Sequence, residues 1–151
     1  MKIISGGQTG VDRAALDVAI DFGIPCGGWC PKGRRSEDGT IPDKYPMQET
    51  PSPHYEERTE WNVRDSDGTL ILTIGKPTGG TALTIEFATK HDRPCLVVDL
   101  NEPVNPASVA KWIIQEKISI LNDAGPRGSS NPQIYGLAVD LLKQALRCFA
   151  A

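Results

Sequence analysis

Short apolar runs of the kind found in β-strands alternate along this chain with segments of helical period, and no other feature of the sequence constrains the fold as much. The chain has 151 residues, 39% of them hydrophobic, which suits one domain with a core and leaves little room for a second. Strand-helix alternation of this kind is typical of α/β proteins, in which helices cover both faces of a mostly parallel sheet. We therefore predict a single three-layer α/β domain over residues 1–151. Its five expected strands are Ile3-Ile4, Pro25 to Cys30, Thr69 to Ile74, Cys95 to Leu100 and Ile118 to Leu121.

The helical segments between these strands have clear start and stop signals. In the first of them, Val11, Ala14 and Val18 form one apolar stripe, and Gly23-Ile24-Pro25 ends the helix. The same pattern predicts helices near residues 11–22, 55–65, 81–91, 106–116 and 132–149. No internal repeat or low-complexity segment interrupts them.

The handedness of the connections predicts the strand order. If every strand-helix-strand crossover is right-handed, the second strand lies on one side of the first, and the long segment before the third strand lets the chain return to the other side. The expected order is therefore 2-1-3-4-5, in a Rossmann-like, mostly parallel sheet. In such sheets ligands bind beyond the carboxyl ends of the strands where the order reverses, which places the crevice between strands one and three.

Two glycine-bearing loops follow those two strands, and each opens a helical segment. The first N–H groups of a helix lack partners within the helix and lie at the positive end of its dipole, while glycine lets an anion approach the backbone. The two loops therefore predict a phosphate-binding crevice, although a plain strand-to-helix turn remains open for the first. Its candidate contacts are Gly6, Gly7, Gln8, Thr9 and Gly10 from the first loop and Thr78, Gly79, Gly80 and Thr81 from the second.

The loop at residues 124–131, after the last expected strand, is a third candidate for anion binding. It contains glycines, hydroxyl side chains and Arg127. The expected strand order places it two strands from the crevice. It would then contribute at the rim of the pocket or in a neighbouring subunit, or form a solvated turn.

Residues 31–53 form a long Pro-rich segment without clear periodicity, a length typical of functional lids or of disorder. Its apolar residues, Ile41 and Tyr45 among them, favour an ordered loop that drapes over the domain. Its basic residues Lys32, Arg34 and Arg35 would then close over a bound phosphate.

Charge and cysteine content restrict the partners. The 16 basic and 19 acidic residues give a net charge of -3, so we expect neither nucleic acid nor an anionic membrane as the partner, and any anion site must be local. The four cysteines lack the paired spacing of zinc ligands, which predicts no bound metal. No signal-peptide pattern or membrane-length apolar run is present, which favours a cytoplasmic protein.

Arg13 is expected in the first turn of a helix. Its positive charge is unfavourable at that end of the helix dipole unless it binds an anion or pairs with a carboxylate.

Taken together, these motifs resemble the family of putative molybdenum-cofactor carriers, Rossmann-like proteins related to the lysine-decarboxylase-like group. The resemblance covers nearly the whole chain. It implies a protein that binds or carries a phosphorylated pterin, the molybdenum cofactor (molybdopterin), or a nucleotide-like ligand, and that forms a homo-oligomer. The segments that carry it are Ser5 to Ala14, Cys30 to Arg35, Asp65 to Thr69, Gly79 to Thr81 and Ala124 to Arg127.

The wider group includes LONELY GUY-type phosphoribohydrolases, whose hallmark is Pro-Gly-Gly-x-Gly-Thr-x-x-Glu. On this chain the pattern begins at Thr78 and ends at Glu86, keeping two glycines and the glutamate but not the proline, third glycine or threonine. Arg58, nine residues before Asp67, matches an arginine of these enzymes. The resemblance thus implies a second hypothesis, a nucleoside-monophosphate phosphoribohydrolase with Glu86 and Arg58 as catalytic residues, and a third, a non-catalytic nucleotide-sensing module. The altered loop favours binding over hydrolysis.

Overall fold

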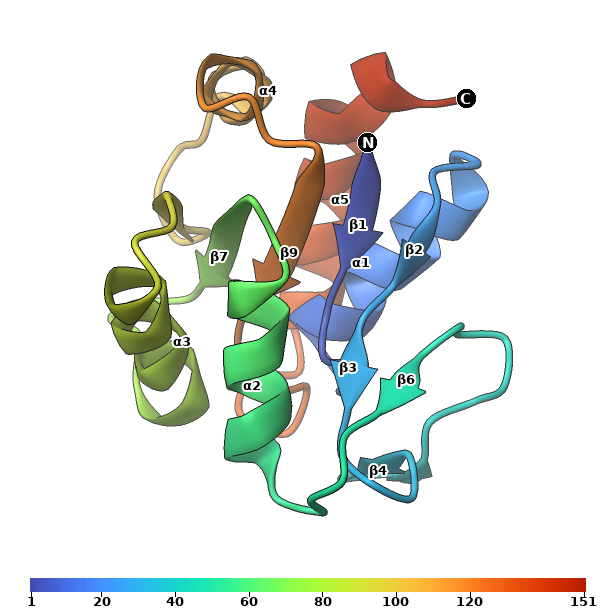
Figure 1. Ribbon diagram of the computed structural model, residues 1–151. Coiled ribbons are helices and arrows are strands. Elements are labelled where there is room, and N and C mark those ends of the chain that lie inside the picture. Colours follow the sequence, from blue (N-terminus) through green and yellow to red (C-terminus); the bar gives the residue numbers. More distant parts are fainter.

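An all-parallel, five-stranded sheet forms the middle layer of the domain (Figure 1). The computed structural model describes residues 1–151. The α/β class, the single domain and the parallel sheet agree with the sequence-based prediction. The strands of the sheet are β1 (Lys2–Ile4), β2 (Cys26–Gly27), β7 (Gly68–Thr73), β8 (Cys95–Asp99) and β9 (Ile120–Ala124).

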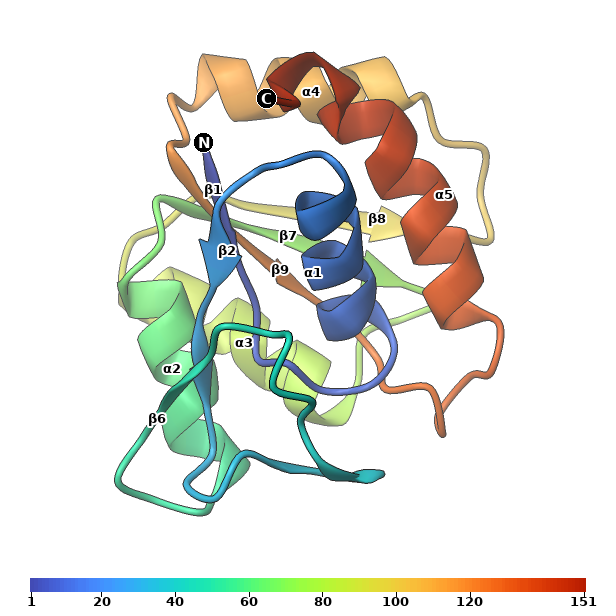
Figure 2. The ribbon, with the colours of Figure 1, turned by 90° about the vertical axis from the view of Figure 1, so that its right-hand side faces the viewer.

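Helices cover both faces of the sheet, as Figure 2 shows from the side. On one face α5 packs against both α1 and α4, and on the other α2 packs against α3. All five expected helices are present near their expected bounds, and a short 3-10 turn, Arg147–Phe149, extends the last one. The helices are α1 (Val11–Asp21), α2 (Tyr55–Arg64), α3 (Gly79–Lys90), α4 (Pro106–Gln115) and α5 (Ile134–Leu146).

The position of the last strand differs from the prediction. The sheet has the order β2-β1-β9-β7-β8, which is 2-1-5-3-4 along the chain, so the expected order 2-1-3-4-5 is wrong for β9. A right-handed crossover ties the face that a helix covers to the direction in which the chain moves. Because α4 lies on the same face as α1 and α5, the chain turns back after β8, and β9 enters the sheet between β1 and β7. The sequence does not reveal the face of α4, so handedness alone cannot determine this step.

The expected order reappears when the strands are counted from β7. If the count continues across the chain ends, β7, β8, β9, β1 and β2 become strands one to five, and the sheet reads 2-1-3-4-5. Both termini lie at the same end of the molecule (Figure 1), and the N–H of Ala151 donates to the carbonyl of Phe22 at the end of α1. The switch point of this sheet therefore lies between β7 and β9, the strands that flank the order reversal.

Burial agrees with these strand positions. All six residues of β7 are buried, and the middle three residues of β9 are buried as well, as central strands require. In contrast, β8 lies at the edge, where Val97 is 42% exposed. The main core fills the space between the sheet and the α1, α4 and α5 layer, with Ile3, Leu72 and Leu121 fully buried.

The Pro-rich segment is an ordered strap across the carboxyl end of the sheet. Its apolar residues Ile41 and Tyr45 form a second small core with Leu16 and Cys30, which confirms the draped arrangement. The expected strand at Pro25 to Cys30 is split, because its second half leaves the sheet to pair within the strap. The strap strands are β3 (Trp29–Cys30) paired with β6 (Gln48–Glu49), and β4 (Arg35–Ser36) paired with β5 (Gly39–Thr40) in a hairpin.

None of the helices combines the length and the apolar character that crossing a bilayer requires.

Candidate functional site

Three loops meet at the carboxyl end of the sheet and enclose a pocket of about 690 Å³. They follow β1, β7 and β9, and the start of α2 closes the fourth side. The volume falls within the range typical of small-molecule sites. Only four of the 22 lining residues are hydrophobic, so the pocket suits a polar ligand.

The second glycine loop presents an open helix N-terminus to this pocket. Thr78, Gly79, Gly80 and Thr81 all line it, and no side chain caps the start of α3. A Cβ atom added at Gly79 or Gly80 would meet nothing within 4 Å. Lys76 lines the same wall and has no carboxylate partner within salt-bridge distance. Partial positive charge and a free ammonium group therefore face the same space.

The N-terminus of α1, in contrast, is closed by the protein itself. The N–H of Val11 donates to the carbonyl of Pro126 at 3.3 Å. Thr9 Oγ1 accepts from the N–H of Gly128 at 3.2 Å and donates to the carboxylate of Glu37. Of the two glycine loops, only the second leaves its helix N-terminus free.

The remaining residues of the first loop support the pocket floor and the strap. Gln8 lines the pocket, and its Nε2 donates to the Arg35 carbonyl at 2.9 Å, while its buried Oε1 has no hydrogen-bond partner. Gly6 makes room for Arg58, because a Cβ there would lie 2.0 Å from Arg58 Nη1. Gly7 lies beneath the strap, where its carbonyl accepts from Arg13 Nε at 3.1 Å.

A buried ion pair forms part of the floor. Arg58 Nη1 lies 3.6 Å from Asp12 Oδ2, and both residues line the pocket. Burial raises the pKa of the Asp12 carboxyl and lowers the pKa of the Arg58 guanidinium, while the charge of each partner opposes that effect. Arg58 Nε is buried without a hydrogen-bond partner, so this guanidinium keeps one unsatisfied donor.

Asp123 lies beside this pair, on the central strand β9, and is fully buried. Neither of its carboxyl oxygens has a hydrogen-bond partner. Burial raises the pKa of Asp123 well above its ordinary value of 3.8, and the nearby charge of Asp12 adds to this. The group is thus most stable as a neutral carboxylic acid.

We predict that Asp123→Asn reduces the loss of stability toward alkaline pH. The folded state holds the Asp123 proton above pH 3.8, where the unfolded chain has released it, so the free energy of unfolding falls as pH rises through that window. The slope is about 1.4 kcal/mol per pH unit while the folded group stays protonated. Urea unfolding at pH 5, 6, 7 and 8 should show that the free energy of unfolding of the variant increases relative to that of the wild type as pH rises. A constant difference between the two proteins would contradict a buried neutral acid.

The loop after β9 lies at the centre of the site, not at its rim. Because β9 stands between β1 and β7, residues 124–127 and 129–131 line the pocket. The guanidinium carbon of Arg127 lies 4.3 Å from the centre of the Tyr55 ring. That of Arg35 lies 4.5 Å from the same ring.

The other basic residues of the strap have different surroundings. Arg34 donates to the carbonyls of Ile41, Pro42 and Tyr45, so its guanidinium braces the strap internally. Lys32 is exposed and is not among the pocket-lining residues. Arg13 pairs with Asp38 at 2.5 Å, which decides between its two expected roles in favour of a partner carboxylate.

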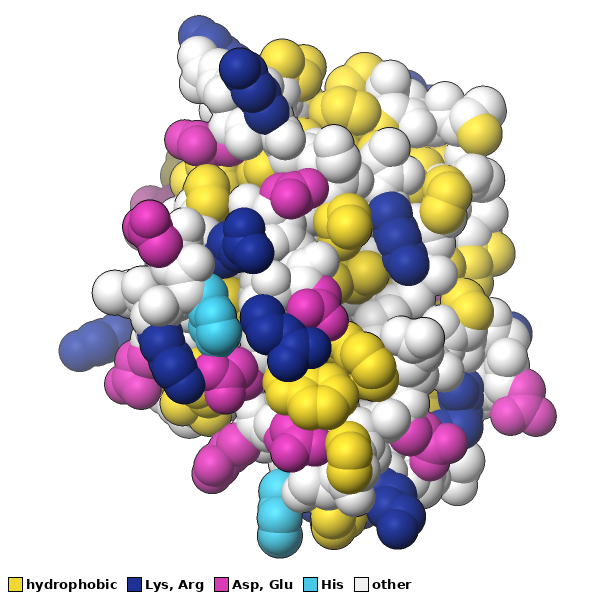
Figure 3. Space-filling view, in the orientation of Figure 1, with side chains coloured by type: hydrophobic (Ala, Val, Ile, Leu, Met, Phe, Trp, Pro, Cys, Tyr) yellow, Lys and Arg dark blue, Asp and Glu magenta, His cyan; other side chains and the backbone are white.

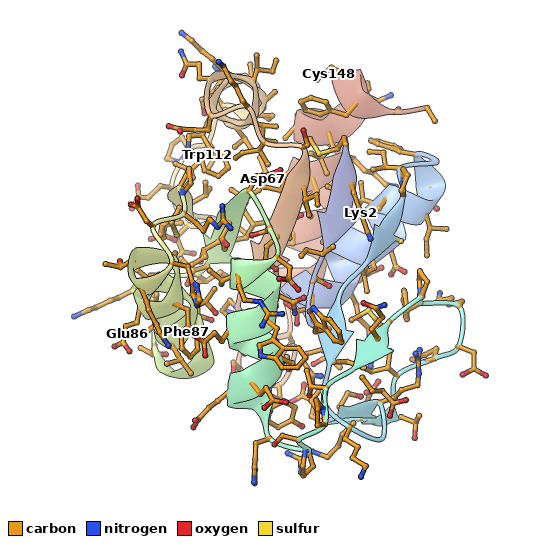
Figure 4. All side chains as sticks on the ribbon, viewed as in Figure 1. Lys2, Asp67, Glu86, Phe87, Trp112 and Cys148 are labelled. Atoms are coloured by element: carbon orange, nitrogen blue, oxygen red, sulfur yellow. The ribbon has the colours of Figure 1, made fainter.

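Glu86 does not face the pocket. It is exposed on α3 and is not among the lining residues, and Figure 4 shows it beside Phe87 at the outer side of that helix. The catalytic role that the hydrolase hypothesis gives Glu86 would require it to face the pocket. Arg58 and Glu86, the two residues of the hydrolase hypothesis, are not brought together.

The positive character of the site is local. In the space-filling view of the α2 and α3 face, basic and acidic side chains lie side by side rather than in one charged field (Figure 3). No group of three or more His, Cys, Asp or Glu side chains is arranged to hold a metal ion.

Residues 3–146 match the Circularly permutated YpsA SLOG family. The chain belongs to this family. Membership explains the strand order, because the cpYpsA chain reads 2-1-3-4-5 only when the count begins at β7 and crosses the chain ends.

A solved structure from Syntrophus aciditrophicus SB, named "Putative molybdenum carrier protein", is also similar to this cpYpsA chain. The two are 50% identical, with a TM-score of 0.91, over 96% of this chain and 94% of the other. None of the curated proteins matches. The family and the neighbour together support a ligand-binding role.

Tyr55, Asp12 and Asp123 are among the site residues that the sequence does not predict. Tyr55 follows the Pro-rich segment without any motif around it, and its position over the pocket depends on how the strap closes. Asp123 lies beyond the expected strand, which ends at Leu121, and follows the polar Asn122, so the apolar run does not indicate its burial.

Proposed function

We propose that this cpYpsA protein binds a small phosphorylated ligand with a flat hydrogen-bonding ring, of the pterin or nucleotide class, and serves as a carrier of the molybdenum cofactor. The observation that carries the proposal is the open N-terminus of α3 beside the unpaired Lys76, both facing a 690 Å³ polar pocket. One phosphate would bind there. The name of the Syntrophus neighbour supports the choice of cofactor.

The rest of the pocket suits the ring of such a ligand. Gln8 and Arg58 line it with an amide and a guanidinium group, which are suited to hydrogen-bonding the polar edge of a pterin or a base. A carrier needs protection of its ligand rather than reactive groups near it. The exposed position of Glu86 favours this function over the hydrolase.

Gly80→Asp should abolish ligand binding. The added carboxylate would stand at the start of α3, in the open space where the phosphate is expected, and would repel it. In thermal melts with millimolar AMP, GMP or oxidised pterin phosphate, the wild type should gain stability and the variant should not.

Gly136→Asp is the matched control. Gly136 is exposed on α5, away from the pocket, and its added Cβ would also meet nothing within 4 Å. It should keep the ligand-induced rise in melting temperature. No rise with any phosphorylated compound in the wild type would contradict the proposal, and release of free base in the same incubations would favour the hydrolase. Molybdenum measured in the purified protein tests the choice of cofactor.

A further inference from the structure

Two guanidinium groups without carboxylate partners lie over the ring of Tyr55. Tyr55 and Arg127 line the pocket, and Arg35, on the neighbouring hairpin, adjoins it through this ring. The guanidinium carbons of Arg127 and Arg35 lie 4.3 and 4.5 Å from the centre of the Tyr55 ring, and neither residue takes part in an ion pair. Arg58, the third arginine near this ring at 5.5 Å, is already paired with Asp12. Attraction to the ring offsets part of the repulsion between the two unpaired cations. An anion within reach of both guanidinium groups would offset more.

The chain places Arg35 in this position through its backbone and its neighbours. Arg35 is exposed and begins the β4–β5 hairpin, and its carbonyl accepts from Gln8 Nε2 at 2.9 Å. At the hairpin tip, the Glu37 carboxylate accepts from the N–H and the hydroxyl of Ser129, at 3.2 and 2.5 Å. Asp38 accepts from Arg13. Four separate contacts thus fasten the hairpin that carries Arg35.

The contacts of Glu37 also join the hairpin to the loop that carries Arg127. Ser129 lies two residues after Arg127, and Thr9 donates to the same carboxylate. Hydrogen bonds from Ser129 and Thr9 lower the pKa of Glu37, so its carboxylate is ionised at neutral pH. The positions of Arg35 and Arg127 are therefore set by one connected group of residues.

We infer that Arg35 and Arg127 form a second anion subsite beside Tyr55, which takes the second phosphoryl group of a diphosphate ligand, and that Glu37 is its positioning residue. The inference rests on the proposed function, because the first phosphoryl group occupies the wall of Lys76 and α3. The loops after the adjacent strands β7 and β9 carry Lys76 and Arg127, so one pocket spans both cations. Planar guanidinium groups suit a terminal phosphoryl group, which they bind with paired hydrogen bonds.

Calorimetric titration of the full chain with AMP and ADP tests the inference, with EDTA present so that no metal bridges the phosphates. The wild type should bind ADP about tenfold more tightly than AMP, which corresponds to about 1.4 kcal/mol. Arg35→Ala should lose most of this preference and keep its affinity for AMP within about twofold. Arg127→Ala should weaken the binding of ADP more than the binding of AMP. Glu37→Gln should lower the ratio of ADP affinity to AMP affinity, as Arg35→Ala does, whereas general loosening of the fold would weaken the binding of both nucleotides.

Arg147→Ala is the matched control, because Arg147 also lies over an aromatic ring, that of Phe22, but outside the pocket. It should change neither affinity. Inorganic phosphate and pyrophosphate are titrated in parallel. If AMP binds and ADP binds no more tightly, the subsite is wrong and the proposed function stands. If pyrophosphate binds more tightly than phosphate while neither nucleotide binds, the subsite stands and the nucleotide class is wrong. If nothing binds, both are wrong.

Discussion

Gly10→Ala should destabilise the protein by about 3 kcal/mol, or roughly 6–12 °C in melting temperature, and should abolish ligand binding. Gly10 has φ of 81° and ψ of -129°, a conformation that residues with a Cβ rarely adopt. Its Cβ would also lie 2.3 Å from the carbonyl oxygen of Pro126, a backbone atom that cannot rotate away. The substitution should therefore push apart the first loop and the loop that carries Arg127. Urea unfolding and nucleotide-induced thermal shifts measure the two effects.

Gly33→Ala separates backbone strain from this contact. Gly33 has nearly the same φ, 84°, but its Cβ would meet nothing within 4 Å. That variant should lose only about 1 kcal/mol and should keep its ligand-induced shift. Equal losses in the two variants would mean that the contact between the loops contributes nothing beyond strain.

The sequence is sufficient to predict the elements of this fold because their signals are local. Apolar stripes, helix stop signals and short β-type runs lie within windows of about ten residues, and the helices fall near their expected positions. The strand order depends instead on which face of the sheet α4 covers. The apolar stripe of α4 would be buried against either face, so its sequence does not select one. A permuted chain order therefore cannot be read from local patterns.

The same contrast between local signals and long-range contacts applies to the candidate site. The second glycine loop was predicted from local signals, and the structure places it in the pocket. The sequence predicts Arg127 as an anion-binding side chain but places it at the rim, because its position depends on the strand order. Gly6, Gly7 and Thr9 have the composition of a phosphate loop, yet their positions in the structure show contacts with Arg58, the strap and Glu37. Composition identifies a flexible polar loop, whereas its partners depend on segments far along the chain.

Arg58→Met should destabilise the protein by about 3 kcal/mol at pH 8, because it leaves the buried Asp12 carboxylate without its partner. The loss should be smaller at pH 5. The variant lacks the charge that lowers the pKa of Asp12 most, so that pKa rises further above its ordinary value of 3.8. The folded variant then takes up a proton that the unfolded chain lacks, and its stability increases as pH falls through that window. Urea unfolding at pH 5 and pH 8 measures the difference from wild type.

Two further variants make this test specific. Arg64→Met removes a half-buried arginine of the same helix that pairs with Asp65 at 2.8 Å, and it should cost less than about 0.5 kcal/mol at either pH. Asp12→Asn combined with Arg58→Met should recover most of the loss at pH 8, because an amide needs no counter-ion. Stability losses that are equal at both pH values, or a double variant no more stable than Arg58→Met, would assign the role of Arg58 to packing. Arg58 would then stabilise the fold through packing of its side chain and not through its charge.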